Sequence, residues 1–262
     1  MPGRLSLYLD QFLGARPLYE DESRPYGEEV TDAEFAGLGA MIGRLHGATA
    51  LIRTDGAPRE QFDFQYDGLF RRFLAGNADV APVNDFQREL LSLWDEDRAN
   101  IATAVERYVG LQARCRATCR PLVVSHGDCH LANILRDSAG SYRLIDWNDA
   151  LLAPPERDLT FYTGVADRFG PFLDVYLDTY DPGLLDPDIF AFYIYQWCVS
   201  EIGSYTHRIL CRNPGTANDE QNESDLSGFR EYVPIQQQRW MESGIAAVAD
   251  VLRQRGISTA GR

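Results

Sequence analysis

The sequence predicts an α+β fold that is mainly helical and carries one small β-hairpin. Apolar residues recur at helical spacing in residues 31–45 and 84–111. Two short apolar runs, Ala132–Leu135 and Tyr142–Ile145, flank the turn-forming residues Asp137–Gly140 and predict the hairpin. The chain has 262 residues, 45% of them hydrophobic, which is enough to bury a sizeable core within one domain.

The first predicted helix begins after Thr31. Thr31-Asp-Ala-Glu34 has the pattern of a capping box, in which two side chains bind the exposed backbone N–H groups at the start of a helix. Asn84 is placed to cap a second helical segment. The residues expected to face the core recur at helical spacing: Phe35, Leu38, Ile42, Leu45, Phe86, Leu90, Trp94, Ile101, Val105, Tyr108 and Leu111.

A third short apolar run, residues 121–125, predicts a strand that leads into the sequence H-G-D-C-H-L-A-N of His126–Asn133. The predicted hairpin brings Asn133, at the start of one arm, beside Asp146, at the end of the other. Asp128 lies on the loop that enters the hairpin. Kinase-type phosphoryl transfer needs a carboxylate to receive or orient the proton of the attacking hydroxyl and two groups that hold metal ions. These three residues therefore predict that chemistry, with Mg²⁺ as the metal that prefers such oxygen donors.

The same segment allows two other interpretations. His126–His130 contains donors for a transition metal, but it lacks the distant pair of ligands that usually completes such a site. A loop with a purely structural role is the second alternative.

Three sequence blocks follow one another in this part of the chain: His126-Gly-Asp128-x4-Asn133, Ile145-Asp146-Trp147 and Ala153-Pro-Pro-Glu-Arg-Asp158-Leu159. In this order they resemble the aminoglycoside phosphotransferase family, which shares the protein-kinase-like fold. The third block is similar to the spectinomycin phosphotransferase-like branch. The resemblance implies a protein-kinase-like large, C-terminal lobe, mainly helical, with a small catalytic hairpin.

The resemblance also implies a role for five residues. Asp128 matches the catalytic base, and Asn133 and Asp146 match the Mg²⁺ ligands. Asp158 matches a buried brace of the catalytic loop, and His126 a residue that supports the loop structurally.

The N-terminal residues resemble the end of the smaller lobe in this family. Arg4–Leu9 is typical of a strand, and Asp10–Leu18 resembles the stretch that crosses between the two lobes. The resemblance implies that the backbone at Gln11, Phe12 and Leu13 is the hinge that binds the adenine edge. An ordinary exit from a strand into a loop is the alternative.

On this interpretation residues 1–22 are the last strand of the N-terminal lobe and the hinge, and residues 23–262 form the helical C-terminal lobe. The chain contains no lysine, and no G-x-G-x-x-G precedes Asp128. Kinases grip the nucleotide phosphates with such groups, so the N-terminal lobe is expected to be largely absent. A truncated, catalytically inactive kinase-like module is therefore an alternative function.

Two further sets of residues are candidates for ligand contacts. Ile134, Leu135 and Ile145 are either core residues alone or core residues that also form the apolar floor under an adenine. Trp197, Glu201 and Tyr205 share one face of a predicted helix at four-residue intervals, C-terminal to the catalytic block. The family resemblance implies an acceptor-binding role for this face, whereas an aromatic stripe at helical spacing is also typical of a core.

Composition limits the partners. With 39 acidic and 25 basic residues the formal net charge is −14, which argues against nucleic-acid binding and favours a cationic small-molecule acceptor. The run Asn218–Asp225 is expected to be a solvated loop or, alternatively, part of an acidic acceptor cleft. No stretch approaches the ~20 apolar residues of a membrane span. The absence of a signal-peptide pattern and the five cysteines, an odd number, suggest reduced thiols in the cytoplasm.

The resemblance implies an ATP-dependent (or GTP-dependent) phosphotransferase that moves the γ-phosphate to a hydroxyl of a small molecule. The implied acceptor resembles an aminoglycoside or aminocyclitol, and the implied biological role is antibiotic resistance. A kinase of the choline or homoserine type is a further alternative.

Overall fold

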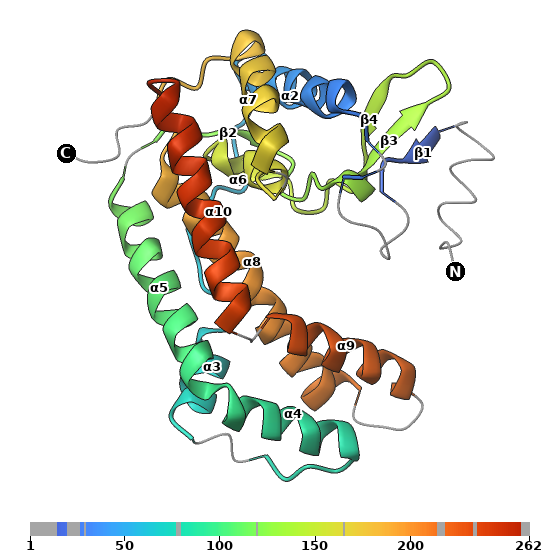
Figure 1. The fold of residues 1–262 in the computed structure, drawn as a ribbon, viewed down its shortest axis with the longest axis vertical. Helices are drawn as coiled ribbons and strands as arrows, with labels where there is room; N and C mark the ends of the chain where they lie inside the picture. Colours follow the sequence, from blue (N-terminus) through green and yellow to red (C-terminus); the bar gives the residue numbers. More distant parts are fainter. Residues whose placement is uncertain are drawn as a thin grey trace. The chain divides into compact units, whose positions relative to one another are not determined.

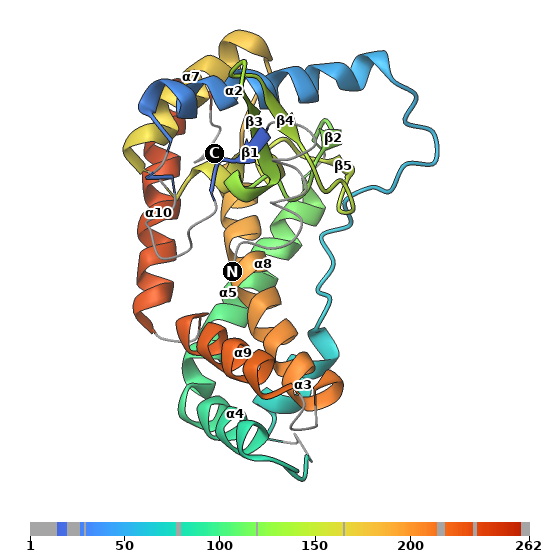
Figure 2. The ribbon, with the colours of Figure 1, turned by 90° about the vertical axis from the view of Figure 1, so that its right-hand side faces the viewer.

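The computed structural model describes residues 15–19, 27–28, 30–76, 80–118, 120–164, 166–213, 218–232 and 235–257. These residues form helices and two small sheets, which confirms the α+β fold (Figures 1 and 2). The chain divides into two compact units. The first comprises Met1–Gln61, Cys119–Phe190 and Gly244–Arg262, and the second comprises Phe62–Thr118 and Ala191–Ser243.

Both sheets belong to the first unit. One has the order β1-β3-β4 and the other pairs β2 with β5, and all pairings are antiparallel. The strands are β1 (Ala15–Pro17), β2 (Val123–Ser125), β3 (Ile134–Asp137), β4 (Tyr142–Leu144) and β5 (Leu151–Ala153). The Asp137 carboxylate closes the turn between β3 and β4 by accepting hydrogen bonds from the backbone N–H groups of Ala139 and Ser141. The predicted hairpin is thus confirmed, and the strand before the catalytic loop is present as β2.

The helical elements that lie wholly in the first unit are α2 (Asp32–Gly47), η1 (Ala48–Leu51), η2 (Leu131–Asn133), α6 (Glu156–Leu159), η3 (Thr160–Tyr162) and α7 (Ala166–Thr179). The capping box of α2 is confirmed: the Glu34 backbone N–H donates to Thr31 Oγ1 at 3.2 Å, and the Thr31 N–H donates to Glu34 Oε2 at 3.0 Å. Arg136 on β3 forms an ion pair with the same glutamate. The hairpin and the start of α2 are therefore tied together.

Helices α2 and α7 lie against each other (Figure 1). Two glycines of α2 make this close approach possible, because a Cβ at Gly39 would stand 2.3 Å from the Phe172 carbonyl oxygen and one at Gly43 2.8 Å from Thr179 Cβ. Around this contact lies an apolar core with contributions from the segment 129–134, including Cys129, Leu131 and Ile134. This segment is thus anchored in the core of its unit.

The second unit contains α3 (Asp67–Leu74), α4 (Asp85–Glu96), α5 (Arg98–Ala117), the π-helical turn η4 (Arg208–Arg212) and α9 (Asp219–Tyr232), while α8 (Pro187–His207) and α10 (Ile235–Gln254) contribute residues to both units. Asn84 caps α4 as predicted, accepting a hydrogen bond from the Gln87 N–H. Trp94 is buried among the rings of Phe70, Phe73 and Phe229.

Two expectations about this unit are wrong. Asn218–Asp225 is not a solvated loop, because residues from 219 onward begin α9 and Asp225 is buried in an ion pair with Arg208 at 2.8 Å. On α4 the residue buried near the N-terminus is Gln87, which donates to the Ile209 carbonyl at 3.1 Å, whereas Phe86 is half-buried. In both places a distant polar partner decides which residue is buried.

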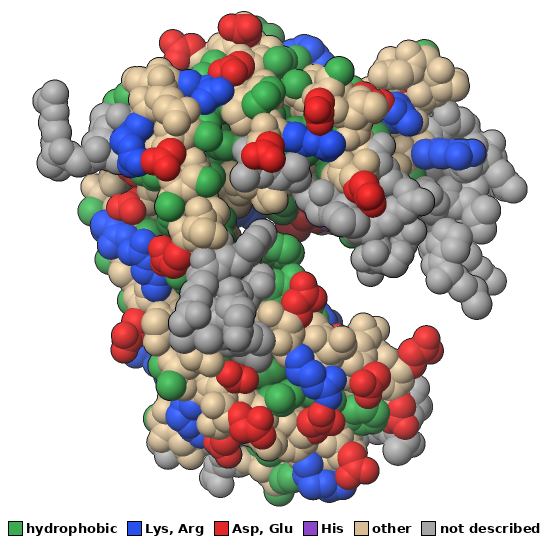
Figure 3. All heavy atoms as spheres, viewed as in Figure 1, with side chains coloured by type: hydrophobic (Ala, Val, Ile, Leu, Met, Phe, Trp, Pro, Cys, Tyr) green, Lys and Arg blue, Asp and Glu red, His purple; other side chains and the backbone are tan. Residues whose placement is uncertain are grey.

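The outer surface carries acidic side chains and arginines that are interspersed over the visible face of each unit (Figure 3). Within the described residues, no helix combines the length and apolar character needed to cross a lipid bilayer. The predicted strand Arg4–Leu9 lies outside the described residues, so the division into residues 1–22 and 23–262 stays a prediction.

Candidate active site

The loop that follows β2 contains Gly127, at a position where any other residue would be strained. Gly127 has φ = 83°, and a Cβ there would lie 2.3 Å from the Asp149 carbonyl oxygen. The loop therefore passes close to the segment that carries Asp146.

The side chain of Asp158, on α6, accepts hydrogen bonds from this loop and from residues beside it. Its buried Oδ1 accepts hydrogen bonds from Ser125 Oγ at 2.8 Å and the Gly127 N–H at 2.9 Å. Its Oδ2 accepts from the His126 N–H at 2.9 Å and from His46 Nε2 at 3.1 Å. Burial alone would raise the pKa of Asp158, but the hydrogen bonds that it accepts from its partners, led by His46, lower it to about 2. The carboxylate is therefore ionised and holds the loop in one conformation.

His46 is a site residue that was not predicted from the sequence; it lies at the end of α2 and is fully buried. Its Nδ1 lies 2.9 Å from the Tyr176 hydroxyl, and its Nε2 faces Asp158. Because an ionised carboxylate accepts only, Nε2 carries the proton and Nδ1 accepts from Tyr176. One feature of the sequence could have indicated that His46 is buried: it lies four residues after Ile42, so it continues the apolar stripe of the helix.

His126 joins the two halves of the site. Its Nε2 donates to the Ile145 carbonyl at 2.9 Å, and its Nδ1 accepts the Asp128 N–H at 3.3 Å. The Trp147 ring packs against its ring with centroids 4.6 Å apart. The buried imidazole thus sets the distance between the loop that carries Asp128 and the segment that carries Asp146.

Asn133 holds Asp128 directly. Its Nδ2 donates to the Asp128 carbonyl at 2.8 Å and to Oδ2 of the Asp128 carboxylate at 2.9 Å. The Ile145 N–H donates to the Asn133 carbonyl at 3.0 Å, so Asp146 directly follows the residue opposite Asn133. Asp146 itself has φ = 62° and accepts from Asn148 Nδ2 at 2.5 Å. The fold thus brings the three residues of the sequence hypothesis to one end of the hairpin.

The donor set at this end suits a hard cation. Both hydrogens of Asn133 Nδ2 point at oxygens of Asp128, which leaves the amide Oδ1 for a cation. The exposed Asp146 carboxylate supplies a second oxygen, and Mg²⁺ typically takes its remaining ligands from water and phosphate. In the described part of the chain, no group of three or more His, Cys, Asp or Glu side chains is arranged to hold a metal.

The proposed hinge, Gln11, Phe12 and Leu13, lies outside the described residues. The strand that follows it, β1, pairs with β3 so that Pro17 stands opposite Leu135. The Leu135 side chain is buried and that of Ile145 half-buried.

The three acceptor candidates lie on the part of α8 that belongs to the second unit. The Trp197 side chain is 54% exposed, and its ring contacts the Tyr232 ring edge-on. Tyr205 stacks on the same tyrosine, and Glu201 is hydrogen-bonded to Tyr205, whose pKa is raised by burial and by this carboxylate. The face is therefore not a plain core stripe, because it combines an exposed indole with a carboxylate.

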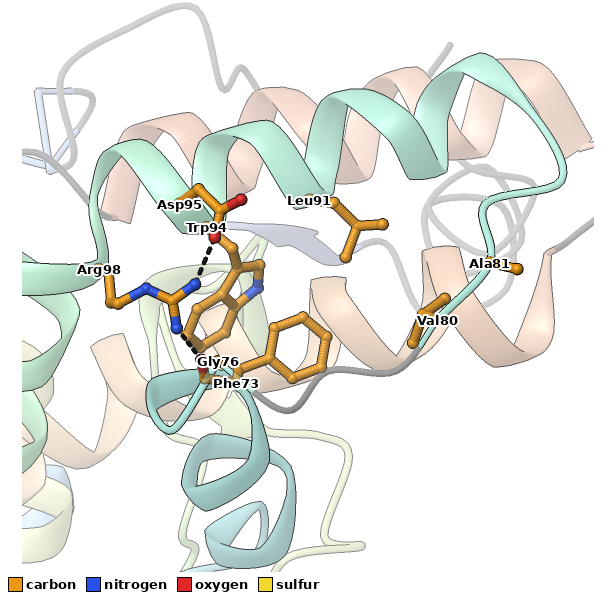
Figure 4. A pocket seen from close by; sticks show the side chains of 8 residues that line it. All are labelled: Phe73, Gly76, Val80, Ala81, Leu91, Trp94, Asp95 and Arg98. Carbon is orange, nitrogen blue, oxygen red and sulfur yellow. Dashed lines mark hydrogen bonds and ion pairs between the residues drawn. The ribbon is translucent and has the colours of Figure 1, made fainter.

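A separate pocket of about 470 Å³ lies in the second unit (Figure 4). Phe73, Leu91 and Trp94 line it, and Arg98 stands at its rim, where it pairs with Asp95 and donates to the Phe73 carbonyl. It contains none of the residues of the three sequence blocks.

Comparison with known proteins places the chain in a family. Residues 4–193 match the phosphotransferase enzyme family. The chain belongs to this family. It is 27% identical to protein StrN of Streptomyces griseus over 189 residues, which cover 69% of this chain and 54% of StrN. The chain thus spans about half the length of this curated relative.

Solved structures of two phosphotransferases show the same fold. A spectinomycin phosphotransferase in complex with ADP and spectinomycin superposes with a TM-score of 0.66 at 21% identity, over 87% of this chain and 70% of that one. An aminoglycoside phosphotransferase from Alicyclobacillus acidocaldarius gives a TM-score of 0.55 at 15% identity, over 86% and 68% of the two chains. The fold predicted from the three sequence blocks is confirmed.

Proposed function

We propose that the protein is an ATP-dependent phosphotransferase that transfers the γ-phosphate to a hydroxyl of a small molecule. The observation that carries this proposal is the contact between Asn133 and the Asp128 carboxylate at the end of the hairpin, with Asp146 on the adjacent segment. A proton acceptor beside two oxygen ligands is the arrangement that phosphoryl transfer to a hydroxyl needs.

Asp128 is the proposed catalytic base. As the acceptor oxygen bonds to the γ-phosphorus and the bond from that phosphorus to the β–γ bridging oxygen breaks, the hydroxyl proton passes to Asp128. Asn133 and Asp146 would hold Mg²⁺, which when bound neutralises charge on the phosphates. His126 and Asp158 support the site by fixing the loop through the hydrogen bonds described above.

ATP, or GTP, is the proposed co-substrate. Family structures have been solved with ADP and with AMP, which supports a nucleotide site in this chain as well. Gln11, Phe12 and Leu13 are the proposed hinge, and the chain continues from them into β1, which lies beside β3. Leu135 and Ile145, on either side of the hairpin, are the proposed apolar contacts of the adenine.

The proposed acceptor is a cationic molecule of the aminoglycoside or aminocyclitol type, with antibiotic resistance as the biological role. A family member binds spectinomycin, and the net charge of −14 favours a cation. Glu201 provides a carboxylate for an amine, and the exposed Trp197 and the neighbouring Tyr205 provide aromatic faces for cation–π contact.

The test is acceptor-stimulated ATP consumption by the full chain, with spectinomycin, an aminoglycoside, choline and homoserine as acceptors. Asp128→Asn keeps the size of the side chain but removes the base, so kcat is expected to fall by about 10²–10⁴-fold with an unchanged melting temperature. Asp178→Asn, at an exposed position of α7, is the matched control and should leave kcat unchanged. Normal turnover in the Asp128→Asn variant would overturn the assignment. Stimulation by choline or homoserine alone would favour a metabolite kinase.

A catalytically inactive kinase-like module is the second candidate. It is favoured by the absence of lysine from all 262 residues, since kinases hold the nucleotide phosphates with one, and arginine does not reproduce its compact charge. Calorimetry with ADP distinguishes the candidates. The enzyme should bind ADP more tightly with Mg²⁺ than with EDTA, whereas the inactive module should show no such difference.

A further inference from the structure

A second histidine of the catalytic loop faces the proposed base. His130 Nε2 lies 3.6 Å from Oδ2 of Asp128, and each side chain is 36% exposed. The separation exceeds a hydrogen bond, and catalytic contacts of this kind commonly shorten when the substrate binds.

The backbone fixes the orientation and the tautomer of His130. Its side chain caps η2, because the Ala132 N–H donates to His130 Nδ1 at 3.3 Å. A ring nitrogen that accepts a hydrogen bond is unprotonated, so in the neutral ring the proton resides on Nε2, the atom that faces Asp128. The Phe161 ring on η3 lies against the other side, with centroids 6.3 Å apart. The imidazole is therefore held on two sides with its N–H directed at the carboxylate.

Two nitrogen atoms thus lie near the same oxygen of Asp128. Asn133 Nδ2 donates to Oδ2 at 2.9 Å, and His130 Nε2 faces Oδ2 as well. Among the described residues, no hydrogen bond reaches Oδ1. The neighbouring donors thus occupy Oδ2, and Oδ1 is the oxygen that remains open to the hydroxyl of an acceptor.

We propose that His130 is a positioning residue that, as the Nε2–H tautomer, orients Asp128 so that Oδ1 receives the proton of the acceptor hydroxyl. This role rests on the proposed phosphotransferase function. His130 takes up no proton in the reaction. It acts only through the orientation and the charge distribution of Asp128.

Two substitutions separate capping from the contact with Asp128. The amide of His130→Asn has its oxygen near the former Nδ1 position and asparagine is a good cap, but its side chain is too short to face Asp128. The longer His130→Gln places an N–H near the former Nε2 position and is a poor cap. We expect His130→Asn to keep the melting temperature and to lose about tenfold in kcat with an unchanged KM for ATP. His130→Gln should regain most of kcat while melting about 2–4 °C lower.

A kcat that follows the melting temperature across the two variants, or a wild-type kcat in His130→Asn, would overturn the proposal. Nitrogen NMR of the imidazole rings provides a readout that does not require turnover. The chain has four histidines, and the signal lost in His130→Asn identifies His130. An unprotonated Nδ1 and a protonated Nε2 are expected near pH 8, and the opposite tautomer would overturn the proposal even in an active enzyme. Absence of Asp128-dependent turnover would instead overturn the phosphotransferase function itself, and the positioning role with it.

Discussion

Two carboxyl groups on the four-residue helix α6 show how hydrogen-bond donors decide ionisation in a buried site. Asp158 receives four hydrogen bonds, and its pKa is lowered to about 2 despite burial. Glu156 is equally buried, but its Oε1 accepts a hydrogen bond from the Asp186 N–H at 2.8 Å, and among the described residues its Oε2 has no hydrogen-bond partner. Burial dominates and raises the pKa of Glu156 to about 7, although the backbone N–H groups of Asp186 and of Glu156 itself and the nearby Arg120 oppose the shift.

Glu156 should make the fold less stable above neutral pH. A carboxyl group whose pKa is raised on folding contributes its full stability below the unfolded value near 4.5, and that contribution is lost as the pH rises through about 7. Glu156→Gln keeps the shape without the charge. Its free energy of unfolding should match the wild type at pH 4.5 and exceed it by up to about 3 kcal/mol at pH 8.5. Urea unfolding at the two pH values measures this difference.

The control for this comparison is Glu106→Gln, at an exposed position of α5. It should change the free energy of unfolding by less than about 0.5 kcal/mol at both pH values. A Glu156→Gln variant whose difference from the wild type is independent of pH would show that folding does not raise the pKa of Glu156.

At the scale of single residues, the sequence allowed us to predict site residues that lie close together in one motif. It did not reveal the distant residues that contact them. Asp128, Asn133 and Asp146 could be named because the hairpin that joins them is local. His46 is 112 residues from Asp158, and nothing in a single sequence pairs the two. His130 was visible in the motif, but its direction depends on the Ala132 N–H, which only the backbone conformation shows.

At the scale of elements, the contact between α2 and α7 depends on glycine at particular positions. Alanine favours a helix over glycine by up to about 1 kcal/mol, so Gly37→Ala, with no atom within 4 Å of the added Cβ, should stabilise the protein by that amount. At Gly39 the same change places Cβ 2.3 Å from the Phe172 carbonyl oxygen. Backbone cannot move aside cheaply, so Gly39→Ala should lower the free energy of unfolding by roughly 2–4 kcal/mol.

Chemical unfolding of the two variants, which carry the same substitution two residues apart, tests the contact. Helix propensity acts alike on both, so their difference isolates the packing between α2 and α7. Equal effects would mean that the two helices separate without cost.

Local chemistry also explains which elements the sequence could predict. Two helix caps and one turn were predicted correctly. Each is formed by a side chain, that of Thr31, Asn84 or Asp137, which binds a backbone N–H group three or four residues away. The start of α9 was misjudged because its many acidic residues are typical of a loop. Burial of Asp225 requires Arg208, which lies 17 residues earlier on another element. Interactions across that distance leave no periodic trace in the sequence.

At the scale of the whole molecule, the division into two compact units was not predicted, because each unit is assembled from separated stretches of the chain. Composition did carry one property of the whole chain, its net charge of −14. Many arginines lie in ion pairs at the surface, such as Arg71 with Asp67 and Arg53 with Asp55. Exposed pairs of this kind contribute only about 0–1 kcal/mol each, so they do not offset the repulsion among the excess carboxylates.

Salt should therefore stabilise this protein. Raising NaCl from 20 to 300 mM at pH 7.5 shortens the screening length from roughly 20 Å to below 8 Å and weakens repulsion among exposed carboxylates. The melting temperature should rise by roughly 2–4 °C, equivalent to about 1 kcal/mol for a chain of this size. The double variant Glu106→Gln/Asp178→Asn, with one exposed substitution in each unit, should melt higher than the wild type in 20 mM NaCl and respond less to salt. A melting temperature that falls with salt would show that the surface ion pairs outweigh the repulsion.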